Sequence, residues 1–498
     1  MNYFLGVDIG TTHTKAVVTT IAGTTFFEAK RSYGIIRPQP GHEEQDADEI
    51  LDAVTAVIKE AIAQIPSSDK VAAVGFSAAM HSLLPVDQAG KPLHHAIIWA
   101  DTRSKNEAEE ISRDKCAAVI INHTGIPLHP MSPLCKILWF KNNLPDTFSK
   151  AHKFISIKEY VFFHFFGKYI TDHSIASATG YFNIREKKWD KTALNVIGLC
   201  EERLSQPVAT VHAEKELTPS YAELLGIKEN IPFIIGASDG CLANLGSGAV
   251  NHGETALTVG TSGAVRMTVQ RPPSQNDGHL FTYPLADNLF VRGGAINNGG
   301  VILKWLIDLF LSTEKKSAEN YAQLIEIAQQ VPPGANGLIF LPYLLGERAP
   351  IWDADAKGVL FGLTMQHRKE HIVRAALEGI CFTLYNIIKE LEKEYGEVKE
   401  IYVNGGFVQS PFWIQMLADI SGKKLCVTDV ADASSIGAAY LAMYATGYVK
   451  DLSEVKQFTH ITTTYEADES LTTIYQEKFK LFVSLYPKLK DSFTALSS

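Results

Sequence analysis

The stretch LGVDIGTTHTKAVV, residues 5–18, places an aspartate in an apolar run, turns through a glycine and two threonines, and returns as a second apolar run. Small and β-branched residues on both sides of the turn predict a β-hairpin. An ionised carboxylate inside such a strand is costly unless it is paired or bound to a cation. Asp8 therefore needs a partner, and the rest of the chain has to supply it.

Size and composition predict a two-domain globular protein. The 498 residues exceed the length over which one core usually grows. Hydrophobic residues make up 46% and charged residues 20%, which is ordinary for a globular chain. The net charge of -9, without any block of five like charges, argues against nucleic-acid and anionic-membrane binding. With no basic leader before an apolar segment and no run of 18 apolar residues, we expect a cytoplasmic protein.

The six cysteines are far apart and form no Cys-x-x-Cys pair. This spacing indicates neither a disulfide framework nor a zinc site. We expect reduced and mostly buried thiols. The cysteines are Cys116, Cys135, Cys200, Cys241, Cys381 and Cys426.

Apolar, β-branched segments that end in glycine turns are interspersed with helical patterns, and this arrangement predicts α/β layers. Strands are expected at residues 3–10, 15–20, 71–77, 232–238, 255–260, 289–294, 337–343, 400–406 and 424–429. Examples of expected helices are residues 47–65, 369–396 and 411–422.

The opening hairpin has an internal echo. DIGTTHTKAVV at residues 8–18 is matched by TVGTSGAVRMT at residues 258–268, about half a chain length later. A chance match is the alternative to a duplication, but the echo begins each half of the chain, which favours duplication. The predicted domains are residues 1–248 and 249–498, each an α/β layer, with a ligand in the cleft between them.

Each of the two turns is suited to phosphate. A glycine lets an oxyanion approach the backbone N–H groups, and two hydroxyls stand beside it. Opposite bound phosphates, Asp8 would hold Mg²⁺ directly or through water. A simple tight hairpin is the alternative for either turn taken alone. The candidate phosphate residues are Gly10, Thr11 and Thr12 in the first turn and Gly260, Thr261 and Ser262 in the second.

Two further strand ends carry candidate groups. In PFIIGASDGCLANLG, Asp239 precedes a small-residue helix, where it could cap the helix or take a proton from a substrate hydroxyl, and the two roles are compatible. In IYVNGGFVQSPFW, Gly405 and Gly406 let the backbone approach a flat or anionic group. The helix that begins near Ser410 and Pro411 favours phosphate at its N-terminus.

Other polar residues stand at strand ends, where a structural role is the alternative to ligand binding. They are Met80 with His81, Asp101 with Arg103, and Glu347 with Arg348. The chain contains no Walker loop, protein-kinase motif set, GxSxG elbow or HExxH motif. P-loop kinases, protein kinases, serine hydrolases and zincins therefore lose their main support.

Two long spaced motifs give the chain a family resemblance. MSPLCKILWFKNN (131–143) and GVLFGLTMQHRKEHIVRAALE (358–378), with VDIGTT, ASDG, VGTSG and NGG in the same order, resemble the signatures of the FGGY family of carbohydrate kinases. This family belongs to the actin/Hsp70/sugar-kinase superfamily. The resemblance implies an α/β fold of two actin-like, ribonuclease H-like ATPase domains with an interdomain active-site cleft.

Within the family, the segments SAAMHSLL, IIWADTRS, GASDGCLANLG and LPYLLGERAP resemble those of gluconate kinases. Xylulose kinases typically have a glutamine before Met-His, Trp-Asn-Asp in place of Trp-Ala-Asp, and Gly-Asp-Asn in place of Ser-Asp-Gly. These differences favour D-gluconate, phosphorylated at its C6 hydroxyl, and leave D-xylulose as an alternative. An ATP-driven binding protein of the actin or Hsp70 type is the alternative of another class.

The resemblance also implies roles for individual residues. Asp8 would bind Mg²⁺, and Asp239 would be the catalytic base. The two Gly-Thr turns would line the ATP phosphates. Gly405 and Gly406 would face the nucleotide with Ser410 nearby, although Phe407 stands where most relatives have alanine. The substrate would contact Met80, His81 and Asp239, with Asp101 and Arg103 at or near the pocket.

The implied partners are ATP and a sugar acid or sugar, and family members are often homodimers. The carboxylate of a sugar acid needs a cation or several hydrogen-bond donors. The candidates are His81, Arg103, Lys158 and His129, and the residues alone do not decide among them.

Overall fold

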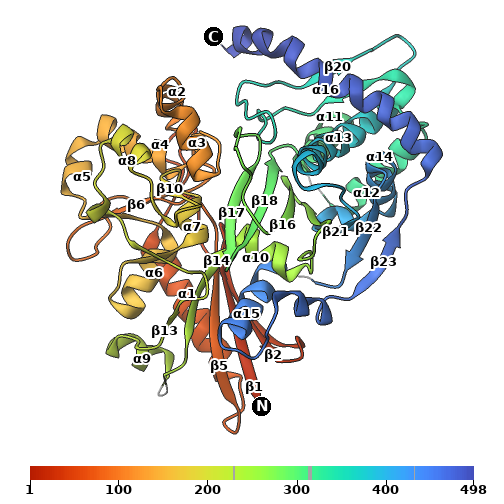
Figure 1. Cartoon of the computed structure of the whole chain (residues 1–498). Helices are drawn as coiled ribbons and strands as arrows, with labels where there is room; N and C mark the ends of the chain where they lie inside the picture. The colour runs from red at the N-terminus through yellow and green to blue at the C-terminus, as the bar shows by residue number, and fades with distance from the viewer. Residues whose placement is uncertain (228–229, 312–316, 431, 498) are drawn as a thin grey trace. The chain divides into compact units, whose positions relative to one another are not determined.

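The computed structural model describes residues 1–227, 230–311, 317–430 and 432–497. The chain forms two compact units that interleave along the sequence (Figure 1). The first unit comprises Met1–Val250, Val269–Val291 and Asp432–Thr459, and the second comprises Asn251–Thr268, Arg292–Ala431 and His460–Ser498. The division into domains of residues 1–248 and 249–498 stays a prediction.

A six-stranded sheet forms the centre of the first unit, and the predicted hairpin lies in its middle. β1 runs antiparallel to β2 and parallel to β5, and β5 is also parallel to β14. Ile9 pairs with Thr14 across the turn, which confirms the hairpin. The strand order is β13 (Ala213–Glu214), β14 (Phe233–Ser238), β5 (Lys70–Ala78), β1 (Asn2–Ile9), β2 (His13–Thr20) and β3 (Thr25–Ser32).

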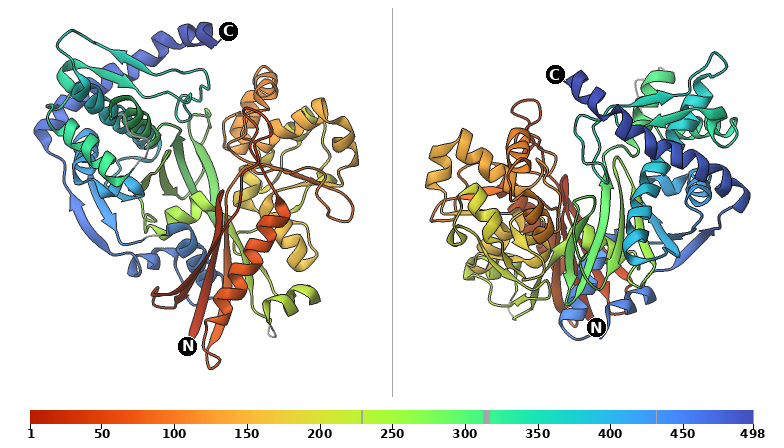
Figure 2. Two further views of the ribbon diagram at one scale, coloured as in Figure 1. Left: turned by 180° about the vertical axis from the view of Figure 1, so that it is seen from behind. Right: turned by 45° about the horizontal axis from the view of Figure 1, so that its top comes forward.

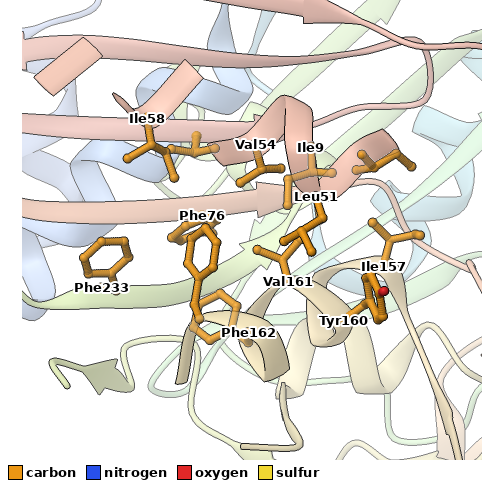
Figure 3. Packing of buried hydrophobic residues seen from close by; sticks show 14 of the residues in the cluster. Ile9, Leu51, Val54, Ile58, Phe76, Ile157, Tyr160, Val161, Phe162 and Phe233 are labelled. Carbon is orange, nitrogen blue, oxygen red and sulfur yellow. The ribbon is translucent and has the colours of Figure 1, made fainter. Parts of the chain in front are cut away.

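One face of this sheet carries a large apolar core. Because side chains alternate along a strand, Leu5, Val7 and Ile9 share this face of β1, and all three are buried. They pack with α1 (Ala47–Ala63) and α6 (Ile157–Phe166) (Figure 3). Phe76 of β5 contacts Phe162 edge to face, with 5.1 Å between ring centroids. Figure 2, seen from behind, shows α1 lying along the strands.

The other face is covered by a helix from the far end of the sequence, α15 (Ala433–Ala445). Gly6 and Gly75 pair in register on β1 and β5, and both face this helix. A Cβ at Gly6 would lie 1.8 Å from the backbone oxygen of Ser435, and one at Gly75 would lie 2.1 Å from that of Ala438. Glycine at both positions therefore lets the helix backbone rest directly on the sheet.

A second apolar cluster lies among the shorter helices of the first unit. These helices are α2 (Lys105–Ser112), α3 (Ala117–Thr124), α4 (Pro133–Asn143), α5 (Pro145–Lys150), α7 (His173–Ser177) and α8 (Lys191–Ile197). α9 (Pro219–Leu225) packs on α1 and belongs to the first cluster, and α10 (Asp239–Gly246) packs on α15. Short strand pairs join them: β4 (Glu44–Gln45) with β7 (Ala96–Ile97), β6 (Leu84–Val86) with β8 (Lys153–Ile155), β9 (Ile170–Asp172) with β12 (Gln206–Val208), and β10 (Phe182–Asn183) with β11 (Lys188–Trp189).

The second sheet repeats the pairings of the first. β15 is antiparallel to β16 and parallel to β21, as β1 is to β2 and to β5. β21 is in turn parallel to β22, as β5 is to β14. The sequence echo therefore corresponds to the same strand pair in two sheets. The strand order is β17 (Phe281–Ala286), β18 (Leu289–Ile296), β16 (Gly263–Val269), β15 (Glu254–Val259), β21 (Glu400–Asn404), β22 (Lys424–Thr428) and β23 (Ile461–Tyr465).

A buried helix, α13 (Lys369–Tyr395), is central to the second unit and packs with α12 (Ala318–Gln329), α14 (Pro411–Ser421) and α16 (Glu469–Ser497). Its length and composition would allow it to cross a membrane, but 83% of its most apolar window is buried, as in the core helix of a soluble protein. It also packs on β19 (Ile339–Leu341), which pairs with β20 (Val359–Phe361); α11 (Val301–Phe310) completes the unit. All six cysteines carry unbridged thiols and four of them are buried, as expected.

We expect Gly6→Ala to displace α15, because the added Cβ has no room beside Ser435. Overpacking of this kind should lower the free energy of unfolding by about 3 kcal/mol or more. Chemical denaturation and amide hydrogen exchange in α15 measure the effect. Gly34→Ala is the control, since a Cβ there meets no atom within 4 Å. Equal stability of the two variants would contradict the close approach.

Candidate active site

Asp8 lies near the end of β1, on the same face as Gly6. One carboxylate oxygen accepts a hydrogen bond from the Ser77 hydroxyl at 2.6 Å, and the other accepts from the Ser434 hydroxyl at 2.8 Å. Ser77 is the partner of Asp8 in the β1–β5 register, and Ser434 belongs to the first turn of α15. The close contact of α15 with Gly6 and Gly75 thus places the Ser434 hydroxyl beside the Asp8 carboxylate.

The surroundings of Asp8 raise its pKa to about 7. Desolvation is the largest cause, and it acts although the side chain keeps some contact with solvent. The negative charges of Asp239 and Asp432 raise the pKa further, while the two serine hydroxyls lower it. Lys15 forms an ion pair with Asp432 at 2.8 Å. Asp8 and Asp239 are therefore near enough to interact, as the predicted chemistry requires.

The first Gly-Thr turn is fixed by hydrogen bonds to neighbouring segments, and its tip is exposed to solvent. Gly10 N–H donates to the His13 carbonyl oxygen at 3.1 Å. The Thr11 hydroxyl accepts from the Trp99 indole at 3.0 Å, and the Thr11 carbonyl accepts from the Gln45 amide at 2.6 Å. Thr12 is exposed. These contacts fix the direction of the turn without covering its outer side.

Asp239 is the first residue of α10, and it follows directly after β14. The helix is capped by Ser238, whose hydroxyl accepts from the Cys241 N–H at 3.4 Å. The alternative that Asp239 itself caps the helix is therefore wrong. Its carboxylate accepts from the Gly240 N–H at 2.6 Å and is partly exposed.

Met80 and His81 follow β5. Met80 borders a small cavity of about 10 Å³ that Gly10, Thr11 and Trp99 also line, which is about enough space for one water molecule. His81 adopts a left-handed backbone conformation, with φ of 66°, and its Nδ1 is 2.8 Å from the carbonyl oxygen of Ala178.

A buried lysine supports the backbone of this region. The ammonium group of Lys136 donates to the carbonyl oxygens of His81 at 2.7 Å and Ile98 at 2.8 Å. Burial lowers the pKa of Lys136 to about 7, opposed by the carboxylate of Asp101. Lys136 therefore links the backbone around His81 to the strand end that leads to Trp99.

Asp101 and Arg103 form a buried ion pair. Arg103 donates from Nε to both oxygens of Asp101 and reaches Glu44 at 2.6 Å, and its guanidinium lies over the Trp139 ring at 4.9 Å. The Arg103 side chain is only 2% exposed. Their predicted place at the sugar pocket stays a prediction.

Glu347 and Arg348 fit the structural alternative. The Glu347 carboxylate is buried and accepts from the backbone N–H groups of Asn297 and Arg348 and from the Asn298 amide. Burial raises the pKa of Glu347. Arg348 donates to the carbonyl oxygen of Ile296 at 3.0 Å.

A large cavity of about 780 Å³ lies in the second unit, between the second Gly-Thr turn, α12 and the N-terminal end of α14. Four predicted nucleotide residues line it: Gly260, Thr261, Gly406 and Ser410. Ser262 and Gly405 are not among the lining residues. Gly405, with φ of 95°, has no room for a Cβ beside the carbonyl oxygen of Val259, so it makes the turn that leads to the cavity.

Aromatic rings and one helix end complete this cavity. Phe407 lines it and contacts Trp413 edge to face, with 5.8 Å between ring centroids. The Ser410 hydroxyl caps α14 by accepting from the Trp413 N–H at 3.3 Å. The other aromatic lining residues are Tyr321 and Phe412. Flat rings beside a helix N-terminus and a Gly-Thr turn suit a planar base attached to phosphates.

The residues present also fit a magnesium ion carried by phosphates. Among the residues that the structure describes, no group of three His, Cys, Asp or Glu side chains is arranged to hold a metal ion by itself. Mg²⁺ typically keeps waters and binds one or two carboxylates together with substrate phosphates. Asp8 fits this pattern, because a cation would relieve the repulsion from Asp239 and Asp432.

Several residues around the site were missed by the sequence analysis. Ser77 is the last residue of a predicted strand, so its position at the strand end was a usable signal. Asp432 and Ser434 come from a run of small residues, DASSIGAAY, whose contact with β1 no local pattern indicates. The cavity residues on α12, among them Tyr321, likewise had no motif.

Comparison with known proteins gives the family. The model of the N-terminal domain of the FGGY family of carbohydrate kinases matches residues 3–246, and that of its C-terminal domain matches residues 255–446. A gluconokinase from Bacillus licheniformis is 40% identical, over 100% of this chain and 98% of the relative.

Two solved structures resemble the whole chain. A gluconate kinase from Lactobacillus acidophilus matches with a TM-score of 0.94 at 35% identity, over 99% of each chain. A ligand-bound xylulose kinase from the same organism matches with a TM-score of 0.94 at 35% identity, over 100% of each chain.

The chain belongs to the FGGY family of carbohydrate kinases. It is an ATP-dependent sugar phosphotransferase with the two-domain, actin-like and ribonuclease H-like fold that the sequence predicted. Membership of this kinase family removes the alternative of an actin- or Hsp70-type binding protein.

We expect Asp8→Asn to stabilise the ligand-free protein at pH 8 while abolishing its activity. A folded pKa of about 7, above the ordinary 3.8, means that the stability from Asp8 is complete below pH 3.8 and is lost as the pH rises through 7. The variant should gain about 2 kcal/mol at pH 8, less than the full shift because Asp8 keeps solvent contact. Thermal unfolding from pH 4 to pH 8 measures it.

The gain should shrink as the pH falls toward 4, because Asp8 is then protonated in the folded protein and increasingly protonated in the unfolded chain. The exposed Asp146→Asn is the control and should show no such trend. A variant no more stable than the parent at pH 8 would mean that the Asp8 carboxylate is not destabilised by its surroundings.

We expect Gly406→Ala to weaken ATP binding about tenfold, which corresponds to about 1.4 kcal/mol. A Cβ at Gly406 meets no protein atom within 4 Å, so the fold should be unchanged, whereas the methyl group would enter the cavity that Gly406 lines. Isothermal titration calorimetry measures the affinity, and thermal unfolding checks the fold. Unchanged ATP affinity would exclude close contact of the nucleotide with Gly406.

Proposed function

We propose that this enzyme transfers the γ-phosphoryl group of ATP to the C6 hydroxyl of D-gluconate, giving 6-phosphogluconate and ADP. The substrate assignment is supported by the 40% identity to a gluconokinase over the full chain and by the likeness to a gluconate kinase structure. Residue differences from xylulose kinases in the segments around Met80, Trp99 and Asp239 support the same assignment.

The observation that carries the mechanism is that Ser238, and not Asp239, is the capping residue of α10. Ser238 caps α10, so the Asp239 carboxylate is not committed to the cap. Asp239 is also close enough to Asp8 to raise its pKa. One carboxylate for a cation and a neighbouring carboxylate for a proton are what phosphoryl transfer to an alcohol requires.

In the proposed reaction, Asp239 accepts the proton of the C6 hydroxyl. The bond between O6 and the γ-phosphorus forms as the bond from that phosphorus to the β,γ-bridging oxygen breaks, and ADP leaves. Positioning and charge neutralisation account for most of the catalysis in such transfers. The proton ends on the Asp239 carboxylate and is lost to solvent after product release.

The nucleotide is assigned to the cavity of the second unit, with Gly260, Thr261 and Gly406 toward its phosphates and Phe407 beside its base. Ser262 and Gly405 would support these positions. On the first unit, Gly10, Thr11 and Thr12 are assigned to phosphate. When bound to ATP and held by Asp8, Mg²⁺ would neutralise phosphate charge during the transfer.

Existing ion pairs reduce the number of cationic residues that could bind the carboxylate of gluconate. Lys158 pairs with the buried Asp172 at 2.7 Å, and Arg103 pairs with Asp101 and Glu44. Taking either cation for the substrate would leave a buried carboxylate without its partner, which is strongly unfavourable. We therefore assign the substrate carboxylate to the neighbourhood of His81 and His129, with Met80 against the carbon chain.

D-Xylulose is the second candidate substrate, because the xylulose kinase from Lactobacillus acidophilus has the same TM-score and identity as the gluconate kinase. The two reactions would share the nucleotide residues and Asp239 and would differ in the sugar pocket. A cytoplasmic location and a homodimeric state remain part of the proposal, in line with the composition and the family.

We expect Asp239→Asn to fold normally and to lose gluconate-dependent ADP formation by a factor of about 100 to 10,000, the usual range for a missing general base. The assay follows ADP release from Mg·ATP with D-gluconate, D-xylulose, L-ribulose or glycerol. Asp52→Asn, an exposed change on α1, is the control and should keep full activity.

Turnover with xylulose alone would keep the mechanism and change the substrate. An Asp239→Asn variant as active as the parent would overturn the assignment of the base. Absence of turnover with all four acceptors would overturn both substrate candidates.

A further inference from the structure

A buried lysine lies behind the proposed base. Lys158, on α6, is 2% exposed, and its ammonium group has three partners. It pairs with the Asp172 carboxylate at 2.7 Å and donates to the carbonyl oxygens of Ile235 at 2.9 Å and Ala237 at 3.0 Å. Burial lowers the pKa of Lys158, opposed mainly by the charge of Asp172. These partners match the three donors of an ammonium group.

The two carbonyl groups flank an irregularity in β14. The register between β14 and β5 shifts between Ile234 and Ala237, and Gly236 adopts φ of 73°. A Cβ at Gly236 would lie 1.6 Å from the carbonyl oxygen of Phe76, so only glycine fits. Such bulges redirect the strand end and the side chains beyond it. Lys158 holds the bulge from both sides, and Asp239 is the residue just past the strand.

A second route leads from the same ion pair to the first turn of α10. Asp172 caps α7 by accepting from the N–H groups of Ser174 and Ile175. The Ser174 hydroxyl donates to the Ser238 hydroxyl oxygen at 3.0 Å and accepts from the Ser238 N–H at 3.2 Å. Ser238 in turn caps α10. The Lys158–Asp172 pair thus contacts β14, the strand before Asp239. Through Ser174, it also contacts Ser238, the capping residue of α10, the helix that begins with Asp239.

We propose that Lys158 is a positioning residue for Asp239: by fixing the bulge in β14 and, through Asp172 and Ser174, the cap of α10, it sets the direction of the Asp239 carboxylate. This inference rests on the proposed function, in which Asp239 is the base. Lys158 has no contact with substrate in this assignment and acts through the carbonyl groups of β14 and through its ion pair with Asp172. A misplacement of a reacting group by about 1 Å can lower the rate about 100-fold.

The test is the double variant Lys158→Met/Asp172→Asn. Methionine has similar length without the charge, and asparagine can still accept the α7 cap bonds, so no unpaired buried charge remains. We expect kcat with D-gluconate to fall about 100-fold. The KM values for ATP and D-gluconate should stay within about threefold, because the groups that bind them are unchanged. The kcat is expressed per ATP-binding site counted by calorimetric titration.

Two further variants keep the test decisive if the double variant does not fold. Ser174→Ala removes the link to Ser238 without changing any charge, and it should lower kcat about tenfold with unchanged KM values. Lys153→Met is the matched control, since Lys153 also donates to two backbone carbonyl oxygens, those of Glu202 and Leu204, both at 2.8 Å. The control should lose stability and keep its kcat per binding site.

A kcat per binding site within twofold of the parent, in the double variant or in Ser174→Ala, would overturn the positioning role. An equal loss of kcat in Lys153→Met would also overturn it, since the effect would then reflect general loosening. The proposed function is tested separately by Asp239→Asn. Full activity of Asp239→Asn would overturn the assignment of Asp239 as the base. An inactive Asp239→Asn variant together with a fully active Lys158→Met/Asp172→Asn variant would overturn only the inference about Lys158.

Discussion

The contact of α15 with Gly6 and Gly75 is the constraint on which the first unit depends. No side chain separates the helix backbone from the sheet at this point, so the position of the helix is set to within a fraction of an ångström. That position brings the hydroxyl of Ser434 to the carboxylate of Asp8 and places Asp432 nearby. The other face of the same strands is packed by large side chains around Phe76 and tolerates no comparable approach.

The cluster around Asp8 is a place where function opposes stability. Three carboxylates gather at strand and helix ends, and Lys15 forms an ion pair with one of them, Asp432. A protein optimised for stability alone would not raise the pKa of Asp8 in this way. The arrangement becomes favourable when a cation and phosphates are present, and this dependence is what a phosphate-transferring site needs. The buried lysines Lys136 and Lys158 support the neighbouring backbone by donating hydrogen bonds to its carbonyl oxygens.

Much of the fold could be predicted because its signals are local. The turn after Asp8, its echo at Thr261 and the glycine pair before Ser410 each combine a strand with a turn that only certain residues can make. The contributions of Ser434 and Lys158 were not predictable, because both depend on the meeting of segments that are far apart in sequence. The helix that carries Ser434 has small and apolar residues on all of its sides, so it shows no amphipathic period. Lys158 sits in an apolar helical run, where periodicity gives no reason for a buried charge.

The late position of α15 in the chain has a consequence for biosynthesis. The strands that carry Gly6 and Gly75 leave the ribosome early, whereas residues 433–445 are made only after most of the second unit. During that interval the glycine-bearing face of the sheet has no covering helix, and the nascent first unit exposes backbone and apolar surface there. The protein therefore completes its N-terminal unit only near the end of translation, and a chain that terminates early lacks the element that finishes its first sheet.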